Sequence, residues 1–162
     1  MYSRFKGSNL KVQISKFKVN MTIHQISIFI ENRSGTMLKV LEVLKKAEID
    51  LIASTVADTT EYGIYRMICS DPVLAEEELK KAGVVATMSE VFALELDNKP
   101  GRAADAVRIF SEAGISISYM YSFLLKGNGI LIFRTDDNEK AREVIEQNHL
   151  KYIDESDLSH MA

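Results

Sequence analysis

The strongest constraint on the fold is an internal repeat with a step of 66 residues. Residues 28–35 read IFIENRSG and residues 94–101 read LELDNKPG, so an acid, an asparagine, a base, a turn-forming residue and a glycine return in the same order. The same step holds without a gap along both copies, and the apolar positions keep their phase. Such a repeat indicates two copies of one supersecondary unit. Because a unit of about 70 residues buries only a small core, the copies are expected to pack against each other.

Each copy changes its hydrophobic period in the same order. Apolar residues alternate in the first segment, as in a strand, and then recur at helical spacing. Two strands joined by a glycine-containing hairpin turn follow, and then a second helix and a short closing strand. The expected strands are 25–31, 49–59, 63–69 and 84–86 in the first copy and 91–97, 115–125, 130–135 and 151–153 in the second. This order predicts an α+β fold: two tandem ferredoxin-like βαββαβ units, each an antiparallel sheet with both helices on one face.

Charge is divided unevenly along the chain. Residues 1–20 carry five basic residues and no acid, whereas residues 21–162 carry the other 15 basic residues and all 23 acidic ones. We therefore expect residues 1–20 to be a basic leader or arm that need not be native, or an added edge strand, followed by domains at 21–88 and 89–162. The acidic body repels phosphate, which argues against nucleic acid as a partner.

Other functional classes find little support in the residue pattern. No apolar run is long enough to span a bilayer and no secretory signal is visible, so we expect a cytoplasmic protein with no membrane partner. The lone Cys69 cannot form an internal disulfide, and the three histidines lack the spacing of a zinc site. We therefore predict no metal, no cofactor and no catalytic residue, and we do not expect an enzyme.

The most informative residues lie in the turn between the first strand and the first helix of each copy. Residues 31–35 (ENRSG) and 97–101 (DNKPG) resemble the ligand loop of ACT domains, a family of regulatory modules that bind amino acids, and the resemblance extends over residues 22–154. At such a helix entrance a glycine leaves room for a ligand, and free backbone N–H groups attract a carboxylate. An asparagine side chain can meet both ends of a free amino acid. The alternative is that Gly and Asn only shape the turn.

The resemblance also implies how the copies join. ACT domains pair side by side through their second strands, with ligand sites between a loop of one domain and strand residues of its neighbour. We expect this seam within the chain, with residues 53–57 against residues 119–123 in one continuous sheet. Small residues of the first copy then face aromatic residues of the second. This arrangement either leaves space for a ligand or lets the large side chains pack against the small ones without a cavity. The candidate ligand-binding residues are Asn32, Arg33, Ser34, Gly35, Thr36, Met37, Ala53, Ser54, Thr55, Asn98, Lys99, Pro100, Gly101, Arg102, Ala103, Tyr119 and Tyr121.

These features favour a small regulatory protein that senses a free amino acid and acts on a partner enzyme or transporter. The sequence does not specify which amino acid is bound, and it is compatible with a homodimer. The main alternative is a regulatory subunit of an amino-acid biosynthetic enzyme, such as the acetolactate synthase small subunit, although that subunit is expected to end in a different domain. An RNA-binding protein of this fold would need aromatic and basic residues on its sheet, and that signature is missing.

Overall fold

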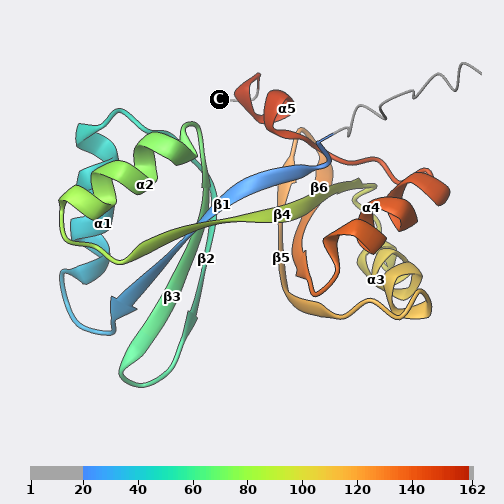
Figure 1. Ribbon diagram of the computed structural model, residues 1–162, viewed down its shortest axis with the longest axis horizontal. Coiled ribbons are helices and arrows are strands. Elements are labelled where there is room, and N and C mark those ends of the chain that lie inside the picture. The colour runs from blue at the N-terminus through green and yellow to red at the C-terminus, as the bar shows by residue number, and fades with distance from the viewer. Residues whose placement is uncertain (1–19, 161–162) are drawn as a thin grey trace, which may run out of the picture.

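The computed structural model describes residues 20–160, apart from the side chain of Ser159, so the predicted arm falls outside the described residues up to residue 19. The described elements are β1 (Thr22–Glu31), α1 (Thr36–Lys46), β2 (Leu51–Asp58), β3 (Tyr62–Cys69), α2 (Pro72–Lys81), β4 (Ala86–Leu96), α3 (Arg102–Glu112), β5 (Ile117–Leu125), β6 (Asn128–Thr135), α4 (Asn138–Gln147) and α5 (Glu155–Ser159). The strands form one antiparallel sheet in the order β2-β3-β1-β4-β6-β5. Figure 1 shows one pair of helices at each end of the molecule, with the strands between them.

The predicted repeat of βαββαβ units is confirmed, and it extends to how the helices begin. The side chain of Asp71 accepts a hydrogen bond from the Leu74 amide (2.9 Å) at the start of α2, and Asp137 does the same for the Lys140 amide (3.0 Å) at the start of α4. These are N-caps, which satisfy donors that a helix cannot satisfy internally. In contrast, α1 and α3 each follow a glycine and have no side-chain cap.

Strand β4 belongs to both copies. Its first part pairs with β1, from Ile28 opposite Ala86 to Thr22 opposite Phe92, and its last part pairs with β6 from Phe92 onward. The predicted closing strand of the first copy and the predicted opening strand of the second copy are therefore one continuous strand. The predicted boundary after residue 88 lies inside it. The closing strand expected at 151–153 is reduced to a single bridge between Leu94 and Tyr152.

The predicted seam between the second strands is wrong. Strands β2 and β5 are the two outer edges of the sheet, so residues 53–57 and 119–123 do not pair with each other. Ala53 pairs with Ile68 on β3, and Tyr121 pairs with Ile132 on β6. The sheet is continuous because β4 runs on from one copy into the next and aligns with β1, which makes a separate seam unnecessary.

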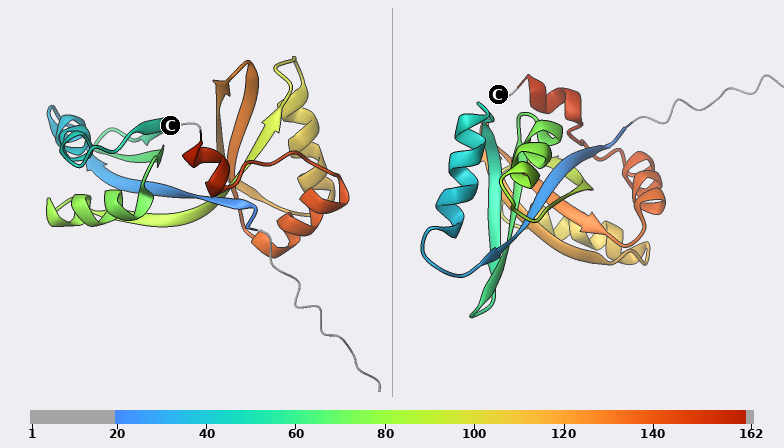
Figure 2. Two further views of the ribbon diagram at one scale, coloured as in Figure 1. Left: turned by 90° about the horizontal axis from the view of Figure 1, so that it is seen from above. Right: turned by 60° about the vertical axis from the view of Figure 1, so that its left-hand side comes forward.

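The copies nevertheless pack on each other through the face of each half-sheet that carries no helices, which we call the open face. Figure 2 shows β5 and β6 standing steeply to β1 because the sheet is strongly twisted. A shared core forms there in addition to the two cores under the helix pairs. Its buried members are Ile23, Ala53, Ile68, Val91, Ala93, Ile130, Ile132, Ile153 and Leu158. The half-buried Tyr121 and Phe123 pack against this group, so small Ala53 and large aromatic side chains share one core although their strands do not pair.

A polar centre lies within this contact between the copies. The side chain of Gln25 is fully buried, and its amide donates a hydrogen bond to the Tyr119 hydroxyl (2.7 Å) and accepts one from the Tyr121 hydroxyl (2.9 Å). The Arg66 guanidinium lies 3.9 Å from the centre of the Tyr119 ring, a cation–π arrangement. One amide thus joins β1 of the first copy to two tyrosines of the second.

This centre predicts how stability depends on alkaline pH. Burial raises the pKa of the Tyr121 hydroxyl well above its ordinary value of 10.0. The folded protein therefore keeps the Tyr121 proton when the unfolded chain begins to lose it, and the free energy of unfolding falls as the pH rises through about 10. Replacement Tyr121→Phe should remove this contribution to the pH dependence. Denaturation curves recorded from pH 8 to 11 should therefore show that the free energy of unfolding falls less steeply with pH in the variant than in the parent. Parallel declines in the two proteins would contradict the assignment.

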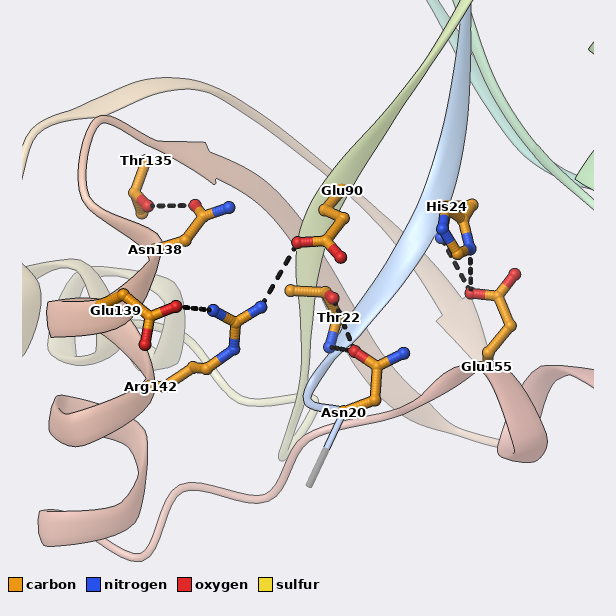
Figure 3. Close-up of polar contacts among 9 residues, drawn as sticks. All are labelled: Asn20, Thr22, His24, Glu90, Thr135, Asn138, Glu139, Arg142 and Glu155. Carbon is orange, nitrogen blue, oxygen red and sulfur yellow. Dashed lines mark hydrogen bonds and ion pairs between the residues drawn. The ribbon is translucent and has the colours of Figure 1, made fainter. Parts of the chain in front are cut away.

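Helix α5, which the sequence analysis did not predict, ties the end of the second copy to the first. Figure 3 shows Glu155 of α5 beside His24 of β1. The Glu155 carboxylate accepts a hydrogen bond from the His24 backbone amide (2.8 Å) and lies 3.3 Å from Nδ1 of the His24 ring. In the same view, Arg142 of α4 bridges Glu90 on β4 (3.3 Å) and Glu139 (2.9 Å). Among the described helices, none is long and apolar enough to cross a membrane.

Candidate functional site

The ligand loop predicted in each copy connects the end of a central strand to the start of an uncapped helix. Gly35 and Gly101 hold φ values of 90° and 88°, in the left-handed region that side chains disfavour. A Cβ built on either glycine would meet no atom within 4 Å. These glycines are therefore required first of all by the left-handed backbone conformation at the start of each helix. Because no side chain fills the position, open space also remains beside the helix entrance.

The two loops hold their asparagines differently. The Asn32 side-chain amide lies 3.4 Å from the Thr59 and Thr60 carbonyl oxygens, and its backbone amide donates to the Glu61 carbonyl (2.8 Å). The first loop is thus fastened to the β2–β3 hairpin. The side chain of Asn98 makes no such bond to any residue in the described part of the chain, so its amide is available to a ligand.

Ion pairs order the charged side chains of both loops. Arg33 Nε lies 2.7 Å from the Glu31 carboxylate, and Arg102 Nη2 lies 3.0 Å from the Asp97 carboxylate. Lys99 Nζ is 3.9 Å from the same Asp97 carboxylate. All of these side chains are about half exposed or more, so each ion pair contributes little free energy. A charged ligand could therefore take the place of one partner in such a pair.

Each loop faces the edge strand of its own copy across a cavity, which we call the loop pocket. The pocket of the second copy has a volume of about 250 Å³ and lies between the loop, α3, β5 and β6. The pocket of the first copy has a volume of about 160 Å³ and lies between the loop, α1, β2 and β3. The two linings correspond through the 66-residue step, from Ile30 and Leu96 to Gly63 and Gly129. The repeat therefore reproduces the cavity as well as the fold.

Eight of the predicted site residues line these pockets: Asn32, Arg33, Thr36 and Met37 in the first, and Asn98, Lys99, Arg102 and Ala103 in the second. Ser34, Gly35, Pro100 and Gly101 form the adjoining turns and are exposed. Residues Ala53, Ser54, Thr55, Tyr119 and Tyr121 lie outside both linings. Three of them serve the contact between the copies, because Ala53 is in the shared core and the Tyr119 and Tyr121 hydroxyls are both bonded to Gln25.

The residues on the strand side of each pocket were not among the predicted site residues. Val56 and Asp58 of β2 line the first pocket, and Ser122 and Leu124 of β5 line the second. Successive side chains of a strand point to opposite faces, and the predicted strand residues, apart from Ser54, are at odd-numbered positions, which face the other copy. The helices lie on the face of the even-numbered positions. The 66-residue step applied to those positions would have found both pairs.

A model of the ACT domain pair family matches residues 21–162 of the chain. Among solved structures, protein BT0572 from Bacteroides thetaiotaomicron is 34% identical, with a TM-score of 0.82, and the match covers 86% of this chain and 97% of that one. The ligand-free regulatory subunit of aspartate kinase from Thermus thermophilus is 15% identical, with a TM-score of 0.54, over 80% of this chain and 93% of its own. The alpha and beta subunits of aspartokinase are 15% identical, with a TM-score of 0.51, over 78% and 95%. The last two likenesses show a shared fold. None of the curated proteins matches the chain.

Proposed function

The chain belongs to the family of ACT domain pairs, and from this premise we propose that it is a regulatory protein that binds a free amino acid in its loop pockets. The observation that carries the proposal is the uncapped entrance of α1 and α3 beside a cavity. The second helix of each copy has an aspartate cap, whereas the first helix has none. The first turns of α1 and α3 thus keep backbone N–H groups without a side-chain partner, whereas in α2 and α4 an aspartate accepts a hydrogen bond from one of these groups.

The chemistry of the second pocket suits both ends of an amino acid. Backbone amides in the first turn of α3, at Ala103 and Ala104, have no partner within the helix and can donate to a carboxylate. The Asp97 carboxylate lies on the same lining and can accept from an ammonium group. The Asn98 amide can serve either end. This combination supports reversible binding, and we propose no cofactor and no catalytic step.

The output of such a sensor would be a change in contact with a partner. Strands β2 and β5 have unpaired outer edges with exposed apolar side chains at Leu51, Val56, Met120 and Leu124. Unpaired edges of this kind accept another strand. We propose that a regulated enzyme or transporter, or a second copy of the chain, binds at these edges, next to the pockets. The ACT match extends through both copies, which favours this reading over a subunit that ends in a different domain.

A thermal-shift screen against the twenty amino acids tests the proposal. We expect one amino acid, or a small group of similar ones, to stabilise the protein by about 2–3 kcal/mol at 100 times its dissociation constant. The variant Gly101→Val should lose this shift at the second pocket, because valine disfavours the backbone conformation of the loop. Gly114→Val is the matched control, since Gly114 also has a positive φ of 71° but lies at the other end of α3.

The control separates strain from binding. Both variants should lose some intrinsic stability, of about 1–3 kcal/mol, because both place a branched residue in the left-handed region. Only Gly101→Val should lose the response to the ligand. Twenty flat melting curves for the parent protein would refute the proposed function, and an unchanged response in both variants would refute the site.

A further inference from the structure

The two loop pockets carry opposite net charge. The first lining holds the charged side chains Glu31, Arg33 and Asp58, and the second holds Asp97, Lys99 and Arg102. The acid and the base within each loop are retained between the copies. The inversion comes from two other positions of the repeat, where the first copy has a threonine and an aspartate and the second has an arginine and a leucine.

At the first of these positions, the threonine and the arginine have different tasks. The Thr36 hydroxyl lies 2.7 Å from the carbonyl oxygens of both Glu31 and Arg33, so it is used within its own loop. The Arg102 guanidinium is half-exposed and touches Asp97 at 3.0 Å and Asp105 at 3.7 Å. A guanidinium has five N–H donors in a planar fork, which is enough to keep both aspartates as partners and to donate to the carboxylate of a ligand as well.

At the second position, an acid is replaced by an apolar side chain. Asp58 lines the first pocket and would repel an anionic ligand there. Leu124 stands at the corresponding place and leaves no negative charge on the β5 side of the second pocket. The second pocket is also larger, with Ala103 in the place of Met37, so it has more space for a ligand side chain.

We infer that the second pocket is specific for an amino acid with a second carboxylate, and that the first pocket excludes this ligand. The inference rests on the proposed function, which supplies contacts for the α-carboxylate at α3 and for the ammonium at Asp97. Arg102, aided by Lys99, then receives the side-chain carboxylate. A dicarboxylic amino acid has one net negative charge, which complements the excess of one positive charge on this lining.

Isothermal titration calorimetry of the full chain tests the inference with aspartate and glutamate against asparagine and glutamine. Each pair has nearly the same shape and differs by one charge. We expect one acid to bind with one site per chain, at least ten-fold more tightly than its amide. Its affinity should fall with added salt more steeply than the affinity of the amide, because the contact is between exposed charges.

Two arginine variants locate the contact. Arg102→Thr, which installs the residue of the first copy, should weaken binding of the acid at least ten-fold and weaken binding of the amide far less. Arg108→Thr is the matched control, because Arg108 lies on the same helix and pairs with Asp105 at 3.2 Å but is outside the pocket lining. It should bind the acid like the parent.

The outcomes distinguish this inference from the proposed function. Equal affinity for an acid and its amide, or an unchanged affinity in Arg102→Thr, would overturn the inference. Binding of a neutral or basic amino acid alone would also overturn it but leave the proposed function in place. Failure of all twenty amino acids to bind would remove both.

Discussion

Cutting the chain after residue 88 should abolish folding of both parts. Residues 21–88 and 89–162, expressed separately, are expected to show no cooperative unfolding transition, because the cut divides β4 where Met88 and Ser89 pair with β1. Moving the cut to residue 97 would spare the first copy but take from the second the strand that pairs with β6. Each part would also expose its side of the shared core. Circular dichroism melts of each part test this directly.

A cut elsewhere serves as the control. The β2–β3 hairpin turns at residues 59–61, which are exposed and lie at the edge of the sheet. A protease site inserted there should be cleaved without loss of the cooperative transition, since no strand is divided. If residues 21–88 and 89–162 instead proved to be stable monomers, the shared strand and the shared core would not be needed for folding.

Replacement Gln25→Leu should destabilise the protein by about 2–6 kcal/mol. Leucine fills the buried site but leaves the Tyr119 and Tyr121 hydroxyls without the amide that pairs them, and each unpaired group costs about 1–3 kcal/mol. Urea denaturation should show a lower midpoint with an unchanged slope. The triple variant Gln25→Leu, Tyr119→Phe, Tyr121→Phe is the control and should recover most of the loss, because it removes the unpaired hydroxyls. Equal loss in the single and triple variants would mean that shape, not hydrogen bonding, makes Gln25 important.

The elements of each copy could be predicted because local signals agree with the repeat. The two hydrophobic periods, the aspartates before α2 and α4, and the glycines before α1 and α3 are each visible in the sequence. Helix α5 had a signal that was overlooked. Asp154 and Asp157 form a capping box, and the hydrogen bonds from Ser156 and Asp157 hold the pKa of Asp154 below its ordinary value.

The junction of the copies could not be predicted in the same way. The segment 86–96 contains no glycine, proline or asparagine, which favours one unbroken strand, but the repeat step suggested a boundary inside it. The pairing of Gln25 with two tyrosines of β5 depends on how far the sheet twists, and no local pattern reports that. The loops were located from sequence, whereas the strand side of each pocket required knowing which face the helices cover.

The proposal that an amino acid binds in the loop pockets is tested most directly by mapping which residues a bound amino acid perturbs. Backbone amide NMR spectra should be recorded while the amino acid found in the thermal-shift screen is added. We expect the largest chemical-shift changes at the second loop pocket, at Asn98, Ala103 and Ala104 and across it at Leu124 and Gly129. Shifts centred on the contact around Gln25, or spread over the molecule without a focus at either loop pocket, would contradict the proposal.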